Sequence, residues 1–429
     1  MNTLAAIKIW NHRVGAILWD ESKNVGFFEF DKDFVKLPFD LSPLMLPIED
    51  ARKGRRVYSF PFLNYETFKG LPGLLADSLP DKFGNQVIDA WLAQQGRSAQ
   101  LFNPVDRLCY IGKRGMGALE FEPESGQLAT PSNPLEIEAL VQFAREVLDQ
   151  RATFKTNLQS ENGFSDLLQV GSSAGGARAK AIVAYNPSTG EVRSGQIDGL
   201  AGYDYWLIKF DGVTNHQLGD PKGYGNIEYA YYLMAQAAGI TMMESQLKKE
   251  NQRAHFMTKR FDRLNNQKLH TQTLCGLAHF DYNMPGAYSY EQAFQIMRQM
   301  QLPYTDMEEL FRRMVFNIMA RNQDDHTKNI SFLMNPEGKW SLSPAYDITF
   351  AYNPSNFWLK SHQMTINGKK DNLNLTDVLT VAKNVHLKKP TQLIQECREA
   401  IVRWGEFADA AFINSEQQAE IKGFFNLLM

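Results

Sequence analysis

The chain has 429 residues, of which 44% are hydrophobic and 22% are charged, the proportions of an ordinary globular protein. Such a composition excludes a chain that is disordered throughout, and the length allows roughly two to four domains. The 45 basic residues against 48 acidic residues give a net charge of −3. That balance leaves no basic excess for wrapping nucleic acid or lying on anionic lipid, so a polyanion must meet a local site.

The cysteines and the apolar runs bear on where the protein works. Cys109, Cys275 and Cys397 are far apart in the chain, so neither a disulfide framework nor a zinc ribbon is expected. A reducing, cytoplasmic setting fits this pattern. The first residues do not resemble a signal peptide, and no apolar run approaches the roughly 20 residues that span a bilayer. We therefore expect no association with a membrane.

The first 130 residues contain short elements broken by turns. Residues 4–30 alternate between apolar and polar positions and predict a small β-meander. One helix is expected near 82–95, within a stretch rich in Gly and Pro, and residues 104–123 are interpreted as a Gly-broken loop followed by a short strand. The polar sequence TPSNP near residue 130 predicts the end of a first domain.

A strand-rich stretch follows. Asn133 and Glu136 form a capping box that predicts a helix from Pro134 onward. Residues 226–238 predict a further helix, which ends at Gly239. Strands are predicted at residues 180–185, 203–211 and 255–263.

From about residue 290 the pattern becomes helical. Thr305 and Glu308 form a second predicted capping box. The Met and Phe side chains in 311–319 are interpreted as core, as are Met242 and Met243. The sequence thus predicts a small α/β subdomain at 1–130, a strand-rich lobe at 131–285 and an all-helical lobe at 286–429. A cleft between two lobes is a common place for a ligand site.

The strongest local signal is the polar loop RNQDDHTKNISFL at 321–333. Asp324 and Asn329 have the D-x-x-x-x-N spacing of a kinase catalytic loop, in which the aspartate accepts the proton of the attacking hydroxyl and the asparagine holds magnesium. The alternative is a solvated polar loop whose side chains cap neighbouring elements.

Asp347 lies in the otherwise apolar sequence SPAYDITF. A carboxylate is expensive to bury unless it meets a cation. Mg²⁺ prefers one or two carboxylates together with phosphate oxygens, so Asn329 and Asp347 could form half of a magnesium shell that ATP completes. The alternative is an aspartate that caps the turn after Pro344.

Lys209 interrupts a strand of large apolar residues, YWLIKFD. Lysine is rarely buried without a partner. In protein kinases a strand lysine reaches the nucleotide phosphates, and a helix glutamate orients it; Glu228 on the following helix is the candidate here. The alternative is an edge-strand lysine that extends to water.

A loop of small residues precedes the strand at 180–185. Nothing larger than Ser lies between Gly171 and Ala177, so backbone N–H groups could approach an anion closely, and Arg178 and Lys180 add positive charge. The loop matches neither the Walker A pattern nor G-x-G-x-x-G. The alternative is a tight β-turn that binds no ligand.

Together these segments resemble the HipA family of bacterial serine/threonine kinase toxins, along nearly the whole chain. The resemblance is carried by FKGLPGLLADSLPD at 68–81, GKRGMGALEFEP at 112–123, the loop at 171–180, YWLIKFD at 205–211, KRFDR at 259–263, QDDHTKNISF at 323–332 and SPAYDI at 343–348. The last two segments are the most specific.

The resemblance implies an α+β, two-lobed, protein-kinase-like fold and a serine/threonine protein kinase that uses ATP and Mg²⁺. Asp324 would be the catalytic base, Asn329 and Asp347 would bind magnesium, and Glu228 would orient the lysine. The ATP-binding residues would be Gly175, Gly176, Ala177, Arg178, Ala179, Lys180, Lys209, Lys259, Arg260, Phe261, His326, Lys328, Asn329 and Tyr346. Autophosphorylation of Ser173, or of Ser172 beside it, would displace the loop and silence the kinase.

The resemblance also implies partners. The substrate would be a protein of translation such as an aminoacyl-tRNA synthetase, whose inactivation arrests growth. A small helix-turn-helix antitoxin would bind the chain, which would then reach DNA only through that antitoxin. The sequence departs from the family where Lys259 follows Met257 and Thr258 in place of an acidic residue. Two other functions remain open: a small-molecule or lipid kinase on the same fold, and a non-catalytic module that binds ATP or only its antitoxin and acts in repression.

Overall fold

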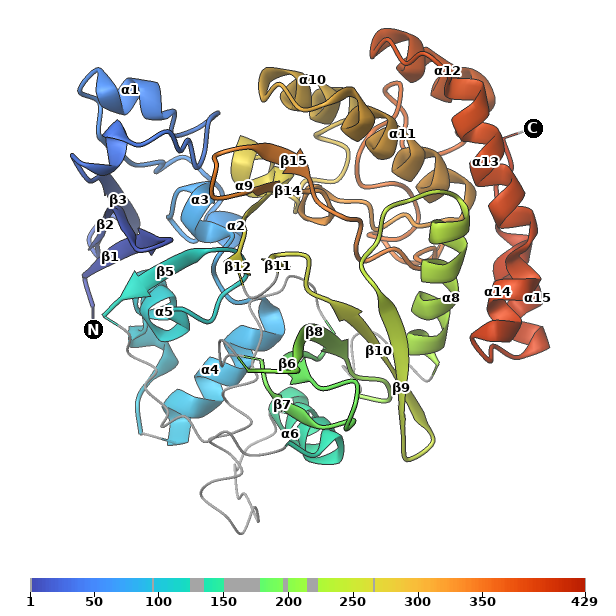
Figure 1. Cartoon of the computed structure of the whole chain (residues 1–429), viewed down its shortest axis with the longest axis horizontal. Coiled ribbons are helices and arrows are strands. Elements are labelled where there is room, and N and C mark those ends of the chain that lie inside the picture. The colour runs from blue at the N-terminus through green and yellow to red at the C-terminus, as the bar shows by residue number, and fades with distance from the viewer. Residues whose placement is uncertain are drawn as a thin grey trace.

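The computed structural model describes residues 2–94, 96–123, 135–149, 178–195, 200–213, 223–264 and 267–428 (Figure 1). The predicted capping residue Asn133 lies outside these residues. So does most of the small-residue loop, including Ser172, Ser173, Gly175, Gly176 and Ala177.

The N-terminal part is built on an antiparallel sheet of five strands. Its order is β4-β3-β2-β1-β5, and the predicted meander of 4–30 forms its centre. The strands are β1 (Leu4–Ile9), β2 (His12–Asp20), β3 (Val25–Phe30), β4 (Val57–Tyr58) and β5 (Leu119–Glu122). Alternate side chains such as Ile7, Ile17 and Phe28 are fully buried on one face, as the period of two requires.

Five helices accompany this sheet. They are α1 (Ile48–Arg52), α2 (Tyr65–Phe68), α3 (Gly73–Ala76), α4 (Lys82–Gln94) and α5 (Pro104–Ile111). The predicted helix near 82–95 is α4. The interpretation of residues 104–111 as loop was wrong, because Asn103 and Asp106 form a capping box and Pro104 occupies the first helical position of α5.

A second antiparallel sheet follows in the chain, with the order β7-β6-β8-β10-β9. Its strands are β6 (Lys180–Tyr185), β7 (Val192–Ser194), β8 (Asp204–Lys209), β9 (Ser245–Glu250) and β10 (Arg253–Lys259). The helices beside it are α6 (Ile137–Asp149) and α8 (Tyr224–Ala237). Since β8 is the central strand, Lys209 is not an edge-strand residue. The strand predicted at 255–263 ends at Lys259, and a small hairpin of β11 (Arg263–Leu264) and β12 (Gln267–Lys268) comes after it.

The C-terminal part is mainly helical. Its helices are α9 (Leu274–Ala278), α10 (Tyr290–Gln299), α11 (Tyr304–Met319), α12 (Leu375–Asn384), α13 (Pro390–Val402), α14 (Trp404–Ala410) and α15 (Ser415–Gly423). The prediction of an all-helical lobe at 286–429 was wrong, because a three-stranded sheet combines β13 (His270–Thr273) with β14 (Ser331–Met334) and β15 (Trp340–Leu342). The predicted capping box of Thr305 and Glu308 was also wrong, since α11 begins at Tyr304 after Pro303 and has no side-chain cap.

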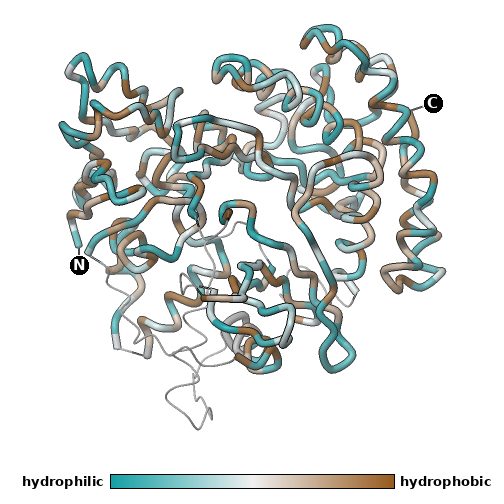
Figure 2. Tube along the Cα trace, viewed as in Figure 1, coloured by the Kyte–Doolittle hydropathy of each residue, from teal (hydrophilic) through white to brown (hydrophobic). Residues whose placement is uncertain are grey.

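The N-terminal sheet and the C-terminal helices lie at opposite ends of the molecule, with the second sheet between and below them (Figure 1). Hydrophobic and hydrophilic residues alternate along most helices (Figure 2), which gives each an apolar side for the core. One core contains Trp91 of α4 together with Val183 of β6 and Trp206 of β8, so apolar packing crosses the boundary expected near residue 130. The three domain ranges stay predictions.

Across the described ranges, none of the helices combines the length and the apolar character needed to cross a membrane.

Candidate functional site

A cavity of about 1120 Å³ lies where the second sheet, the N-terminal helices and the C-terminal part meet. Its lining includes Lys209, Glu228, Asp324, Asn329 and Asp347, so residues from β8, α8 and the two polar C-terminal motifs share one space. The feature on which the sequence argument depended, the meeting of distant motifs in one pocket, is present.

Lys209 is the centre of a buried charge cluster in this cavity. Its Nζ lies 2.5 Å from Oε1 of Glu228 and also contacts Oδ1 of Asp347. Burial alone would lower the pKa of Lys209, but the two carboxylates outweigh burial and raise the pKa above its usual value. The lysine therefore stays charged, and it holds one carboxylate from a helix and one from a loop.

Asp347 is held in an unusual backbone conformation. Its φ is +53°, in the left-handed region that residues other than Gly rarely adopt. Burial works to raise the pKa of its carboxyl, but Lys209 and then Lys180 overcome this and hold the pKa below its usual value. Asp347 thus presents an ionised carboxylate to the cavity.

The loop before β14 is fixed by its own side chains. Asn329 donates from Nδ2 to the backbone carbonyl of Asp324 over 2.7 Å, which leaves Oδ1 of Asn329 as a free acceptor among the hydrogen bonds of the described chain. The Asp324 side chain is 48% exposed, and its Oδ1 lies 3.9 Å from Nε2 of His326. Asp324 is therefore accessible to a substrate while its backbone is fixed.

Asp325, the neighbour of Asp324, points the other way and anchors the loop. Its Oδ2 lies 2.8 Å from Nδ1 of His362 and accepts from the Tyr290 hydroxyl over 3.0 Å, while its Oδ1 accepts from the backbone N–H of Gln363 over 2.8 Å. Asp325 is 3% exposed. The spacing to Asn329 already selects Asp324 in the sequence, whereas the anchoring role of Asp325 becomes visible only in its burial and its hydrogen bonds.

The segment after β10 forms another wall. Lys259 lines the cavity, but its ammonium is held by Asp204 at 2.9 Å and Glu244 at 2.7 Å, so its charge is already neutralised. The Phe261 ring lies 5.4 Å from the ring of Tyr346, whose hydroxyl donates to the Lys328 carbonyl over 2.6 Å. The Arg260 side chain instead is buried against Asp262 and the Gly115 carbonyl, so it joins the N-terminal part to this segment.

The described end of the small-residue loop lies partly inside the core. The Arg178 guanidinium stacks 3.8 Å from the ring centroid of Tyr224. Ala179 is buried, and Lys180 forms a buried ion pair at 3.1 Å with Asp81. Neither Ala179 nor Lys180 is among the residues that line the cavity. Lys180 still acts on the site, since its charge helps to lower the pKa of Asp347.

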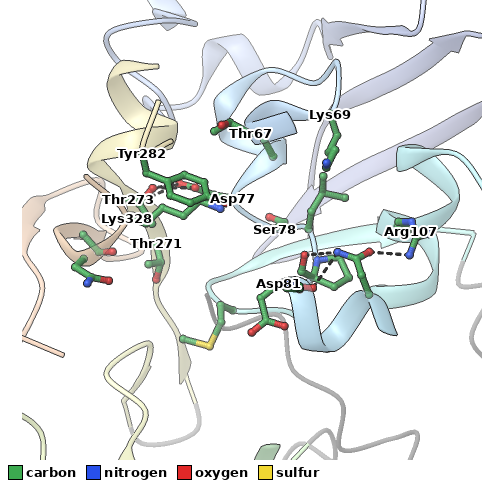
Figure 3. Close-up of a pocket in the computed structure, with 18 of the residues that line it drawn as sticks. Thr67, Lys69, Asp77, Ser78, Asp81, Arg107, Thr271, Thr273, Tyr282 and Lys328 are labelled. Atoms are coloured by element: carbon green, nitrogen blue, oxygen red, sulfur yellow. Dashed lines mark hydrogen bonds between the residues drawn. The ribbon is translucent and has the colours of Figure 1, made fainter. Parts of the chain in front are cut away.

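Several lining residues were missed by sequence reasoning. Met242 and Met243, interpreted as core, are half-buried and line the cavity near Thr258. The N-terminal part adds a second group, which includes Lys69 and Arg107 (Figure 3). Nothing in the local sequence marks either group, because each reaches the cavity only through tertiary packing.

The donor set around Asp347 fits a magnesium ion bound together with phosphate. Oδ1 of Asn329 and the second oxygen of Asp347 are hard oxygen donors that make no hydrogen bond within the described ranges, and Mg²⁺ prefers such donors. No group of three or more His, Cys, Asp or Glu side chains in the described ranges could hold a metal alone. The remaining ligands would have to be phosphate oxygens and water.

The fold matches that of a solved structure. Over 98% of this chain and 94% of the other, the structure aligns with HipA from a Shewanella oneidensis MR-1 complex of HipA, HipB and operator DNA, with a TM-score of 0.66 and 16% identity. An alignment with the Helicobacter pylori proinflammatory kinase CtkA covers 52% of this chain and 88% of that one, but its TM-score of 0.34 and 13% identity are too low to indicate a shared fold.

Two family models match the sequence. The HipA N-terminal domain matches residues 5–122, and the HipA-like C-terminal domain matches residues 172–405. The chain belongs to the HipA family. A curated relative, "Putative kinase Y4mE" of Sinorhizobium fredii, is 26% identical over 229 residues, which are 47% of this chain and 53% of the relative. The chain thus spans about half the length of this curated relative.

Proposed function

We propose that this protein is an ATP- and Mg²⁺-dependent serine/threonine protein kinase and the toxin of a toxin–antitoxin pair. The observation that carries the proposal is the Lys209–Glu228 ion pair with Asp347, in the same cavity as Asp324 and Asn329. A strand lysine paired with a helix glutamate, a metal-binding aspartate and a D-x-x-x-x-N loop are the working parts of kinase chemistry.

Each residue has a part in the proposed reaction. The acceptor hydroxyl oxygen bonds to the γ-phosphorus as the bridging β–γ bond breaks, ADP leaves with that electron pair, and the hydroxyl proton passes to Asp324. Lys209 would move from Asp347 to the phosphates, with Glu228 keeping its orientation. Asn329 and Asp347 would hold magnesium, which neutralises charge on the phosphates when bound. Positioning and charge neutralisation supply most of the rate.

The nucleotide would lie against the apolar wall of the cavity. The adenine would contact the segment from Thr258 to Phe261 and the side chains of Met242 and Met243, since aromatic and sulfur-containing side chains suit a flat heterocycle. His326, Lys328 and Tyr346 would border the phosphates. Because Asp204 and Glu244 neutralise Lys259, the lysine in place of an acidic residue would not repel or attract the nucleotide strongly.

Family membership supports the proposed partners of this protein. The Shewanella oneidensis HipA is in a complex with HipB and operator DNA, and we propose that this chain likewise binds a small helix-turn-helix antitoxin and reaches DNA through it. The proposed substrate is a translation protein such as an aminoacyl-tRNA synthetase, and the proposed silencing sites are Ser173 or Ser172. The net charge of −3 accords with indirect DNA binding.

The test measures phosphorylation by wild type, Asp324→Asn and Asp347→Ala in a lysate with labelled ATP and Mg²⁺. Wild type should label proteins on serine or threonine. Asp324→Asn should lose at least about a hundredfold, a typical size for a general-base contribution, and Asp347→Ala should lose activity because a magnesium ligand is gone. An Asp371→Asn variant, changed at an exposed residue, should match wild type. Transfer only to small molecules or lipids, or no ATP turnover at all, would contradict the proposal in favour of the corresponding alternative.

A further inference from the structure

The cavity is larger than one nucleotide requires. Its volume of about 1120 Å³ exceeds the roughly 300–1,000 Å³ that holds a drug-sized ligand. Beyond Lys328 the cavity is lined by the N-terminal segment from α2 to α4 and by the region of β13 and the loop at 324–329 (Figure 3), and this part is called the arm. Lys328 would border both the ATP phosphates and this arm, whereas Lys69 takes no part in the proposed binding of ATP.

The two walls of the arm are fixed to each other. The backbone N–H and the hydroxyl of Thr273 both donate to Asp77, over 2.8 Å each, and the Gly73 N–H donates to Nε2 of His279 over 3.0 Å. A Cβ on Gly73 would lie 2.0 Å from the carbonyl oxygen of Gly276, so α3 and α9 are in direct backbone contact. The arm is therefore a preformed space.

Two lysines face this arm without an ion pair to any described carboxylate. Lys328 lies 4.7 Å from the ring centroid of Tyr282, and Lys69 lies 5.8 Å from that of Tyr65. The carboxylate of Asp77, on the wall beside Lys328, is already hydrogen-bonded to Thr273. Burial works to lower the pKa of Lys328, but the nearby Cys275, Tyr282, Asp77 and Asp81 outweigh it and raise that pKa, so Lys328 stays charged.

The electrostatics show that these cations share one space. The pKa of Lys69 is lowered, first by burial and also by the charges of Arg107 and Lys328, against an opposing effect of Glu66. Arg107 is itself held by Asp89 at 2.9 Å. The arm thus has room for one anionic group near Lys69 and Lys328, while Glu66 and Asp89 at its borders would repel a polyanion such as nucleic acid.

We propose that the arm is the acceptor subsite, in which Lys69 and Lys328 bind an anionic group, a carboxylate or a phosphate ester, carried by a polypeptide near the hydroxyl to be phosphorylated. This inference rests on the proposed kinase function. Lys328 precedes Asn329, so a group bound there lies at the boundary between the arm and the phosphoryl-transfer centre. Ser78 and Thr271 also line this part of the cavity, whereas the Thr67 hydroxyl is already engaged, donating to Asp281 and accepting from Asn283 over 2.9 Å.

Lys69 offers a variant that does not threaten the fold. Its φ is +52°, and it ends α2 in the left-handed conformation. Asn adopts this conformation more readily than most residues, so Lys69→Asn removes the charge without adding backbone strain. Lys69→Glu reverses the charge. Lys32, exposed and in the same N-terminal part, supplies the matched controls Lys32→Asn and Lys32→Glu.

The probes are synthetic peptides with one Ser and, at a neighbouring position, Asp, Glu, phosphoserine or Lys. Wild type and both Lys32 variants should phosphorylate the anionic peptides with a kcat/KM about tenfold above that of the Lys peptide, a ratio worth about 1.4 kcal/mol. Lys69→Asn should lose the preference through a raised peptide KM, and Lys69→Glu should invert it. A higher rate with the phosphoserine peptide than with the Asp and Glu peptides would identify a phosphate ester as the recognised group. A higher rate with the Asp and Glu peptides would identify a carboxylate.

ATP turnover in the same reactions separates the two proposals. If wild type transfers phosphate to peptides but Lys69→Glu keeps the wild-type preference, the acceptor subsite is overturned and the kinase function stands. If no peptide is phosphorylated and no ATP is consumed, the kinase function fails and the inference fails with it. A binding assay needs no turnover. The Asp324→Asn variant should bind a fluorescent Asp-containing peptide, and adding Lys69→Asn to this variant should weaken that binding about tenfold.

Discussion

At the scale of single residues, the site depends on one lysine that neutralises two buried carboxylates. Lys209 contacts Glu228 and Asp347 together, and both carboxylates would be costly to leave charged without it. In the proposed reaction the lysine exchanges its contact with Asp347 for contacts with the phosphates. The same charges make the stability of the site depend on pH.

We predict that Lys209→Met makes stability fall as pH rises. Burial already raises the pKa of Glu228 against the effect of Lys209, so removing the lysine raises that pKa further. A carboxyl whose folded-state pKa exceeds its unfolded value contributes stability that is complete below the unfolded pKa and is lost as pH rises through the folded pKa. Urea unfolding without nucleotide should therefore show that Lys209→Met has a slightly lower free energy of unfolding than wild type at about pH 5. At about pH 8 the difference should be about 3 kcal/mol.

The double variant Lys209→Met/Glu228→Gln is the control for this pH dependence. It removes Glu228 as a titrating group but keeps Asp347, whose pKa Lys209 also lowers, so the stability deficit should change less with pH than in Lys209→Met. If the free energies of unfolding of wild type and Lys209→Met differ by the same amount at every pH, the pKa of Glu228 does not depend on Lys209, and the prediction is wrong.

At the scale of elements, one buried aspartate joins the N-terminal part to the segment after β10. Asp262 is fully buried and accepts from Nε of Arg260 over 2.8 Å, from Nη1 of Arg263 over 2.8 Å and from the Gly117 N–H over 2.6 Å. Both arginines also donate to backbone carbonyls of the loop before β5. Burial works to raise the pKa of Asp262, but the two guanidinium groups outweigh it and hold the pKa well below its usual range.

We predict that Asp262→Asn destabilises the protein by about 3–5 kcal/mol at neutral pH, because it leaves two buried guanidinium groups without their anion. A depressed folded-state pKa contributes stability that is present above the unfolded pKa and lost as pH falls through the folded pKa. The difference between wild type and Asp262→Asn should therefore shrink below about pH 4. Chemical unfolding checks both statements, with Asp371→Asn as the exposed control; equal stabilities of the two variants at neutral pH would contradict the first.

The elements that sequence reasoning missed have physical explanations. The helix α5 carried a readable signal, Asn103 and Pro104 followed by Asp106, but the glycines at 112, 115 and 117 favoured a loop interpretation for the whole stretch. At α11 the sequence offers a plausible capping box of Thr305 and Glu308. The helix instead begins at Tyr304, because the fixed φ of the preceding Pro303 suits a helix start there.

At the scale of the whole molecule, the site divides into a half that sequence can predict and a half that it cannot. Lys209 and Asp347 each interrupt an apolar stretch, and Asp324 and Asn329 have a recognisable spacing within a polar loop, so the local pattern marks all four. Lys69 and Arg107 lie in the N-terminal part, in segments whose sequence shows no ligand pattern. They reach the cavity only because α2 to α5 pack against the rest of the chain, which no local pattern encodes.

The same packing links the predicted domains energetically. Trp91 of α4 is 7% exposed and belongs to the core that includes Val183 and Trp206 of the second sheet. The buried ion pair of Asp81 with Lys180 joins the start of α4 to β6 beside Lys209. The N-terminal part therefore supports the sheet that carries the candidate catalytic lysine, and the two should not unfold independently.

We predict that scanning calorimetry of the full chain gives one main transition, and that Trp91→Ala shifts all of it to lower temperature. Truncating a buried tryptophan costs about 3–5 kcal/mol through lost burial and the cavity left behind, and a shared core transmits that cost to both parts. Phe62→Ala, at a fully exposed apolar residue, should leave the transition unchanged. A Trp91→Ala trace in which one transition moves and a second stays at the wild-type temperature would show that the N-terminal part and the second sheet unfold separately, despite the core that they share.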